Sequence, residues 1–330
     1  MDRQRRRSLK LFSSICVAAA LPSLARAQQG AYPADTVSVI VPYGAGGSTD
    51  YFARLMAADM AARHNGKFVV ENKPGAAGNI GTRQVALSPP DGKMLLYATA
   101  TPFSINPFIY QSLPYDPDNG FEAAAMTVQV PLVLVAPVSL GVKTLQELID
   151  YLRKNEASSS FSSYGIGTSS HLSNAIFVKA IGAPKVLHVP YKDSRAMPDL
   201  AAGRNTFQVD AWSAVAPLVH AGKLVVLGVC GPQRLPWIPE VPTVSSVIGQ
   251  EYDMSTWHGV FAPKGTPAAI LDTINREVKT TMAKASVQDL AIAQGFVSYP
   301  YKTRAEVAAS VREDKARWKR LVELAGLEPM

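Results

Sequence analysis

The sequence predicts an α/β fold of two lobes, each organised around a doubly wound, parallel sheet. Short runs of β-branched and apolar residues, such as Val37 to Val41, recur along the chain and are typical of buried strands. Segments with apolar residues at helical spacing lie between these runs, and this alternation favours parallel sheets. The chain has 330 residues, of which 47% are hydrophobic, so it is long enough to fill the cores of two lobes.

Residues 1–27 have the pattern of a cleavable export signal. A basic stretch ending at Lys10 precedes an apolar run from Leu11 to Leu24, and Ala25-Arg26-Ala27 is typical of a cleavage site. Because the apolar run is too short to span a membrane, we expect cleavage after Ala27 and a soluble periplasmic protein. Arg6-Arg7 leaves the twin-arginine export route open beside ordinary secretion.

The charge and cysteine content of the mature chain exclude several classes of protein. The expected export signal holds six basic residues and one acidic residue, so its removal lowers the net charge from +7 to about +2. A mature chain of this charge gives no reason to expect a nucleic-acid or anionic-membrane partner. Cys230 is then the last cysteine, which rules out an internal disulfide and favours a buried, inert thiol.

The first predicted unit is a strand, a glycine-rich turn and a helix. Pro42 ends the strand, Gly44, Gly46 and Gly47 follow, and Ser48 is a good N-cap for the helix. Further strands are expected at residues 67–71, 94–98, 131–136, 161–164, 186–189, 207–210 and 223–229, with 131–136 and 257–263 crossing between lobes. Further helices are expected at residues 80–87, 145–152, 172–180, 271–282 and 307–321, and residues 232–247 read as an extended connection.

The pattern of strand, glycines, hydroxyl cap and helix occurs twice, at Gly44 to Asp50 and at Gly165 to His171. The first amides of a helix lack intrahelical partners and lie at the positive end of its dipole, so each turn is a candidate anion site. One such turn alone is equally well explained as a tight connection, but two together favour anion binding. A dinucleotide site is excluded at the first turn, because Thr49 stands where its third glycine belongs.

Several short motifs also occur in a fixed order along the chain. They are Val41-Pro-Tyr-Gly-Ala-Gly-Gly-Ser-Thr-Asp-Tyr-Phe-Ala-Arg54, Val70-Glu-Asn-Lys-Pro-Gly-Ala-Ala-Gly-Asn-Ile-Gly81, Pro90-Asp-Gly92, Asn106-Pro107, Leu113-Pro-Tyr-Asp116, His188-Val-Pro-Tyr-Lys192, Val241-Pro-Thr243 and Trp257-His-Gly-Val-Phe-Ala-Pro263. Each motif is weak alone. In this order, and over essentially the whole mature chain, they resemble the Bug/TctC family, the extracytoplasmic solute receptors associated with tripartite tricarboxylate transporters.

The resemblance implies a periplasmic-binding-protein fold, type II-like, with a ligand cleft between the lobes. It implies a small carboxylated ligand, such as a di- or tricarboxylate, an acidic amino acid or an aromatic acid, and no cofactor. The implied partner is the membrane permease of a tripartite transporter, with a sensor ectodomain as the alternative, and a monomer is expected. The ligand-binding residues implied by position are Tyr43, Gly46, Gly47, Ser48, Thr49, Asp50, Thr101, Ser104, Asn106, Gly167, Thr168, Ser169, Ser170, His171, Tyr191 and Asp210.

The second lobe departs from the family pattern at Asp193, where glycine is usual, and at Asn205-Thr206, where Val-Asp is usual. Ligand preference therefore transfers least well there. The sequence shows no lysine or arginine cluster dedicated to a second or third carboxylate, which favours a monocarboxylate or aromatic acid over citrate. Arg54, Lys192 and Arg195 are nevertheless candidates to reach the cleft. We expect lobe 1 at residues 28–130 and 258–330 and lobe 2 at residues 131–257.

Several candidate residues also have plain structural roles open to them. Asp50 suits the helix dipole or an orienting contact with its loop, and His171 suits a hydrogen bond behind the site. Asp210 is either a helix cap or an acceptor for a ligand donor, while Tyr43 and Trp257 are possible packing residues. Catalysis is not expected, because the chain has neither a G-x-S-x-G nor an H-E-x-x-H motif and no Cys/His spacing for zinc.

Overall fold

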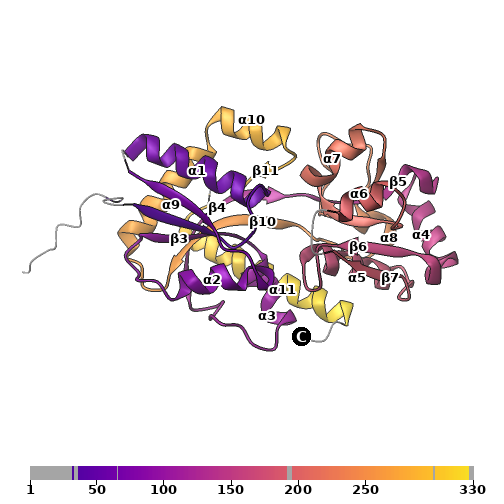
Figure 1. The fold of residues 1–330 in the computed structure, drawn as a ribbon, viewed down its shortest axis with the longest axis horizontal. Helices are drawn as coiled ribbons and strands as arrows, with labels where there is room; N and C mark the ends of the chain where they lie inside the picture. The colour runs from indigo at the N-terminus through magenta and orange to yellow at the C-terminus, as the bar shows by residue number, and fades with distance from the viewer. Residues whose placement is uncertain (1–31, 33–35, 65, 192–194, 300–301, 327–330) are drawn as a thin grey trace, which may run out of the picture.

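The computed structural model describes residues 32, 36–64, 66–191, 195–299 and 302–326. The expected export signal, Lys192 and Asp193 lie outside the described residues. The chain forms two α/β lobes side by side, joined by strands that run from one lobe into the other (Figure 1). Among the described residues, no helix combines the length and apolar character needed to cross a bilayer.

The first lobe is built on a six-stranded sheet in the order β11-β4-β10-β3-β1-β2. Its strands are β1 (Val37–Val41), β2 (Phe68–Asn72), β3 (Met94–Thr99), β4 (Phe121–Val130), β10 (Thr256–Pro263) and β11 (Val297–Ser298). Its helices are α1 (Ser48–His64), α2 (Asn79–Ala86), α3 (Asn106–Ile109), α9 (Ala268–Met282), α10 (Ala285–Ala293) and α11 (Arg304–Ala325). Strands β1, β2 and β3 are parallel, so their carboxyl ends meet at one edge of the sheet.

The second lobe holds a three-stranded sheet, β8-β5-β9, and a parallel pair, β6-β7. A bridge between Phe161 and Phe207 joins β6 to the start of β8, so the two sheets continue one another. The strands are β5 (Leu132–Pro137), β6 (Ser160–Ser163), β7 (Leu187–Pro190), β8 (Gln208–Ala211) and β9 (Leu224–Val229). The helices are α4 (Leu145–Lys154), α5 (Ser169–Ala180), α6 (Ala196–Ala201), α7 (Trp212–His220) and α8 (Val244–Ile248).

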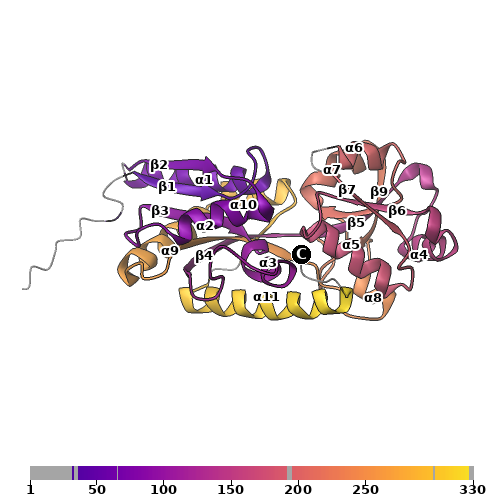
Figure 2. The same cartoon turned by 60° about the horizontal axis from the view of Figure 1, so that its bottom comes forward.

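The chain passes between the lobes twice. It leaves the first sheet through β4, turns at Pro131 into β5 of the second lobe, and returns through β10. Helix α11 then runs beneath both lobes (Figure 2). Its Arg317 donates from Nη2 to the carbonyl oxygen of Ser255 at 2.6 Å, and Trp257 donates from Nε1 to Asp314 at 3.0 Å, so α11 fastens the returning segment.

The alternation of strands and helices is as predicted, but the sheets are mixed rather than purely parallel. Strand β10 is antiparallel to β3 and β4, because it re-enters the first lobe against the direction in which β4 leaves it. Strand β5 is antiparallel to β8 and β9, whose carboxyl ends pair with its first residues. Strand β4, which the sequence analysis missed, carries alanines and polar residues in place of a strong apolar run. The segment after β3 forms a single π-helical turn, Thr101–Ile105, and α3, and the expected extended connection at residues 232–247 contains α8.

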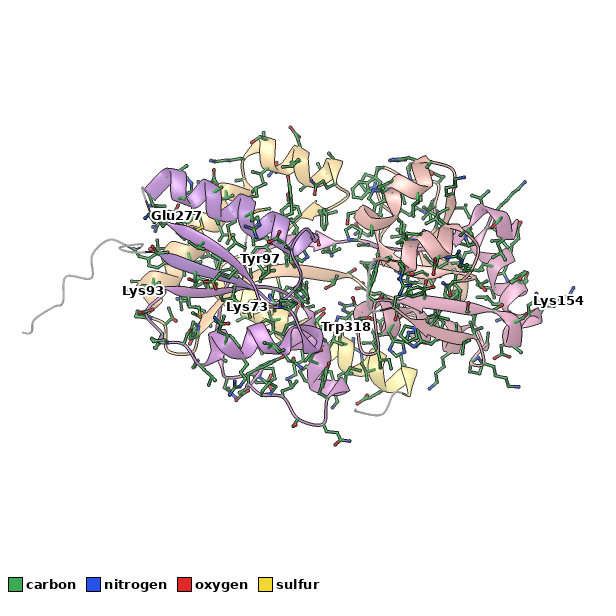
Figure 3. The ribbon with its side chains drawn as sticks, viewed as in Figure 1. Lys73, Lys93, Tyr97, Lys154, Glu277 and Trp318 are labelled. Atoms are coloured by element: carbon green, nitrogen blue, oxygen red, sulfur yellow. The ribbon has the colours of Figure 1, made fainter. Side chains whose placement is uncertain are left out.

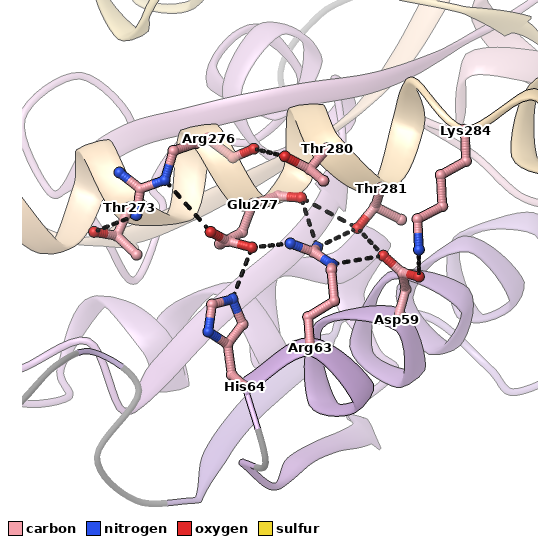
Figure 4. A network of polar contacts seen from close by, with 9 residues as sticks. All are labelled: Asp59, Arg63, His64, Thr273, Arg276, Glu277, Thr280, Thr281 and Lys284. Atoms are coloured by element: carbon pink, nitrogen blue, oxygen red, sulfur yellow. Dashed lines mark hydrogen bonds and ion pairs between the residues drawn. The ribbon is translucent and has the colours of Figure 1, made fainter.

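A partly buried polar network fastens α1 to α9 (Figure 4), and its Glu277 lies on the side of the first lobe away from the second (Figure 3). Arg63 donates from Nη2 to the carbonyl oxygen of Glu277 and to Thr281 Oγ1, both at 2.9 Å, and pairs with the Glu277 carboxylate. Asp59 accepts from Thr281 at 2.8 Å and pairs with Lys284. Charge-assisted bonds of this kind fix the position of α1, whose opposite end begins at the candidate site.

Candidate functional site

A cleft of about 930 Å³ lies between the two lobes. Its first wall consists of the turn before α1, the turn of residues 74–78, and side chains at the end of β3. Its second wall consists of the turn before α5 together with Tyr191 and the end of β8. Crossing strands form the floor. Both predicted turns therefore line the same cleft.

The turn before α1 presents free backbone amides to this cleft. Gly46 has a φ of +83°, and its amide donates to Asp50 Oδ2 at 3.0 Å. Asp50 in turn pairs with Arg54 at 2.9 Å, and the hydrogen bond from Arg54 lowers the pKa of that carboxyl. The amides of Gly47, Ser48 and Thr49 have no hydrogen-bond partner among the described residues, and all three residues line the cleft. Asp50 thus fixes the turn through the Gly46 amide and leaves the amides of Gly47, Ser48 and Thr49 available to a hydrogen-bond acceptor.

The turn before α5 has a similar construction. Thr168 caps the helix by accepting from the His171 amide at 3.3 Å, and its hydroxyl donates to the carbonyl oxygen of Gly165 at 2.7 Å. The Gly167 amide donates to His171 Nδ1 at 3.2 Å, just as the Gly46 amide donates to Asp50. Burial lowers the pKa of His171, so it stays neutral and able to accept this bond. Within the described part of the chain, the amides of Ser169 and Ser170 have no partner.

The turn of residues 74–78 is a third backbone element of the cleft. Gly75, Ala76, Ala77 and Gly78 all have positive φ, and the two alanines are at +47° and +51°. Such a conformation costs about 1–3 kcal/mol for a residue other than glycine, and such strain clusters at functional sites. Asn106 stabilises the turn by donating from Nδ2 to the carbonyl oxygen of Ala77 at 3.1 Å. The sequence analysis quoted these residues within the motif from Val70 to Gly81 but did not assign them to the site.

The floor of the cleft is mainly apolar. It is formed by Val130 and Leu132 from the outgoing crossing and by Thr256 and His258 from the returning one. His258 is 1% exposed, and its Nδ1 has no hydrogen-bond partner among the described residues. Burial lowers the pKa of His258 to about 3, so the imidazole is neutral at physiological pH. The polar side chains of this floor are thus the Thr256 hydroxyl and the neutral imidazole of His258, and none of the four described floor residues carries a charge.

Asp210 lies on the second wall, at the end of β8. The carboxylate accepts from the side chain of Gln208 and from the backbone amide of Ala211, each at 2.7 Å, and the Tyr164 hydroxyl also hydrogen bonds to it. Burial raises the pKa of Asp210 to about 6, against these hydrogen bonds, which lower it. Asp210 is thus mostly ionised at neutral pH.

The structure brings most of the predicted ligand residues into the lining and places others behind it. Tyr43 lies in the lining, and its hydroxyl hydrogen bonds to Thr99 Oγ1 at 2.6 Å. The other predicted residues in the lining are Gly47, Ser48, Thr49, Thr101, Thr168, Ser169, Ser170, Tyr191 and Asp210. The predicted residues outside the lining are Gly46, Asp50, Ser104, Asn106, Gly167 and His171.

The residues outside the lining have physical reasons to be there. Asp50 and His171 are turned back onto Gly46 and Gly167, so they shape the turns without facing the cleft. Ser104 and Asn106 are fully buried, because the π-helical turn at Thr101–Ile105 directs them into the first lobe. Besides the turn at 74–78, the sequence analysis did not assign Thr99, Tyr110, Tyr164 or Thr256, which lie outside the quoted motifs. It also did not assign His258, because the motif from Trp257 to Pro263 was interpreted as a crossing strand and not as part of the site. Trp257 is 3% exposed and is a packing residue.

Among the described lining residues, no serine hydroxyl is hydrogen-bonded to a histidine. Ser163 Oγ lies 2.7 Å from His188 Nε2, but both side chains are outside the lining and Ser163 is fully buried. Within the described ranges, no group of three or more His, Cys, Asp or Glu side chains is placed to hold a metal ion. The described lining offers hydrogen bonds both from backbone amides of the turns and from hydroxyl side chains.

Residues 52–327 match the family model described as the tripartite tricarboxylate transporter family receptor, TctC. The chain belongs to the TctC/Bug family of periplasmic solute-binding receptors. A relative in Pseudomonas sp. (strain P51), described as the UPF0065 protein in the tcbD–tcbE intergenic region, is 32% identical over 95% of this chain and 93% of its own length.

Solved structures of this receptor family share the fold over nearly the whole chain. A protein of R. palustris solved with adipate has a TM-score of 0.84 and 30% identity, covering 91% of this chain and 100% of its own. The periplasmic binding protein BugD has a TM-score of 0.80 and 32% identity with the same coverage. The two-lobe fold with a cleft between the lobes, expected from the sequence, is confirmed.

Proposed function

We propose that this receptor captures a small carboxylated metabolite in the cleft and presents it to the membrane permease of a tripartite tricarboxylate-type transporter. One observation carries the proposal: two helix-opening turns, from opposite lobes, line the same cleft with amides that have no partner among the described residues. The adipate bound to the R. palustris relative agrees with a carboxylate ligand.

The energetics of the two turns suit one carboxylate. Each helix N-terminus carries a charge of roughly +0.5, so the two together balance about one negative charge. Charge-assisted hydrogen bonds contribute about 1.5–3 kcal/mol each, against an association cost of about 4–15 kcal/mol. Several such bonds outweigh this cost only if the donors are already in place. The contacts of Asp50, Thr168 and His171 with their own turns provide that preorganisation.

The proposed contacts to the carboxylate are the amides of Gly47, Ser48 and Thr49 on one lobe and of Ser169 and Ser170 on the other. We further propose that the lobes are divided near residues 130 and 257 and close by a hinge at the crossing strands. Closure would bring the two sets of amides onto one carboxylate and would form the surface that a permease recognises. A receptor acting as a monomer suffices for this cycle.

The test is a thermal-shift screen of the purified receptor, first unfolded and refolded to remove any ligand carried through purification. Carboxylic acids are compared with their amides at equal concentration. We expect at least one acid to raise the melting temperature while its amide does not, because ligands that bind only the folded state stabilise it. Equal shifts with acids and amides would refute carboxylate capture.

A further inference from the structure

The charges around the cleft are suited to a ligand with one carboxylate rather than two. Among the described lining residues there is no lysine or arginine, and Asp210 is the sole carboxylate. The helix N-termini balance about one negative charge. Figure 3 shows Lys93 and Lys154 at opposite outer ends of the molecule, away from the junction of the lobes.

The basic side chains beside the first-lobe turns are already engaged. Arg54 pairs with Asp50 at 2.9 Å and donates to Asn72 Oδ1 at 3.0 Å. Lys73, next to the turn of residues 74–78, lies 3.3 Å from Glu71. Neither side chain lines the cleft. A second ligand carboxylate would therefore enter a wall that holds a negative charge and no described cation.

Asp210 determines which kind of hydrogen-bonding group the other end of the ligand must carry. Its side chain is 7% exposed and lines the cleft. An ionised carboxylate has about four acceptor positions and no donor. Gln208, the amide of Ala211 and Tyr164 occupy three of them, which leaves one acceptor position without a partner among the described residues. A ligand group beside Asp210 must donate a hydrogen bond, because another acceptor there would lose its water without gaining a partner.

We propose that the ligand of this receptor carries one carboxylate, held by the amides of the two turns, and an N–H donor at its other end, held by Asp210. The donor is an ammonium or a primary amide. This inference rests on the proposed function and narrows its ligand class, since the adipate-bound relative accepts a carboxylate at both ends of its ligand.

The test compares ligands of one length that differ only in their ends. Adipate, its half-amide, its diamide and 6-aminohexanoate are titrated calorimetrically into refolded receptor at pH 7.5, and the set is repeated with four- and five-carbon chains. Terephthalate, its half-amide and its diamide form a matched aromatic set. We expect the half-amide or the amino acid to bind at least tenfold more tightly than the diacid of equal length. Preference between these two compounds identifies the donor as neutral or cationic.

Two variants test the assignment to Asp210. Asp210→Asn removes the charge and adds a donor, so the ratio of the dissociation constant of the diacid to that of the half-amide or amino acid should fall to near unity. Asp150→Asn, on the outer helix α4, removes a carboxylate of the same lobe and should keep the wild-type preference. An unchanged preference in Asp210→Asn would overturn the assignment, and this ratio does not depend on the stability of the variant.

The outcomes separate this inference from the proposed function. If a diacid binds as tightly as its half-amide, or more tightly, the single-carboxylate ligand is refuted while carboxylate capture stands. If a diamide binds as tightly as the corresponding acid, or no acid of any set binds, carboxylate capture itself is refuted, and this inference falls with it.

Discussion

Replacing Gly47 by aspartate tests whether the turn before α1 binds an anion. A Cβ added at Gly47 would meet nothing closer than the carbonyl oxygen of Gly44, at 3.8 Å, and the backbone φ there is not positive. Gly47→Asp is therefore expected to fold normally. The new carboxylate would lie beside the free amides that we assign to the ligand.

The expected effect follows from Coulomb's law. A ligand carboxylate about 5 Å from the new side chain, at an effective dielectric constant of about 20, is repelled by about 3 kcal/mol. This energy corresponds to an increase of about 100-fold in the dissociation constant. Because part of the repulsion passes through solvent, we expect the loss to shrink as ionic strength rises.

Isothermal titration calorimetry with the best acid from the screen measures this change. Gly47→Asn is the matched control, since it has the same shape without the charge. Circular dichroism melting establishes that both variants are folded. If Gly47→Asp binds the acid as tightly as Gly47→Asn, the ligand carboxylate does not bind at this turn and the proposed mechanism is wrong.

Three further predictions concern stability. The pKa of Asp210 is about 6 in the folded protein against an ordinary value of 3.8, so ionisation of this carboxyl lowers the stability above pH 6, and the loss disappears as the pH falls towards 3.8. In urea titrations, the unfolding free energy of the wild type should therefore rise by about 1 kcal/mol from pH 7 to pH 5 relative to that of Asp210→Asn. Parallel pH profiles of the two proteins would contradict this prediction. Arg63→Met should lower the unfolding free energy by about 1–3 kcal/mol, because it removes the hydrogen bonds and ion pair of Arg63 in the network of Figure 4. Ligand affinity should stay unchanged, because none of these residues lines the cleft. An unchanged unfolding free energy would show that this network contributes nothing to stability. Gly295→Ala would place Cβ 1.8 Å from Trp212 of the other lobe. This variant should therefore lower the unfolding free energy by at least about 1 kcal/mol more than Gly249→Ala, since Gly249 has a similar φ but open space around it. Equal melting temperatures of the two variants would show that the lobes move apart at this contact without loss of stability.

Much of the fold was predictable because its information is local. The strand at Val37–Val41, the cap at Thr168 and the helix at Ala268–Met282 follow from runs of apolar residues and from single capping residues. Strand β4 was missed because its residues gain their strand conformation from pairing with β10, whose sequence lies far along the chain.

The candidate site divides in the same way. The sequence alone located both turns to which we assign the ligand carboxylate, since the first amides of a helix lack intrahelical partners whatever surrounds them. It left open whether Asp50 and His171 contact a ligand or their own turns, because the direction of each side chain is set by the backbone of the folded turn; the structure shows both in contact with their own turns.

The sequence by itself determined the class of fold, the family and the two turns, since each depends on residues close together in the chain. The tertiary structure alone decided that the turn of residues 74–78 joins these two turns in the cleft, that His258 forms part of its floor and that Asp210 is buried in its far wall. The raised pKa of Asp210 is likewise a property of burial between elements distant in sequence. Ligand selectivity arises from such assembled charges and contacts, and these exist only once the two lobes have folded.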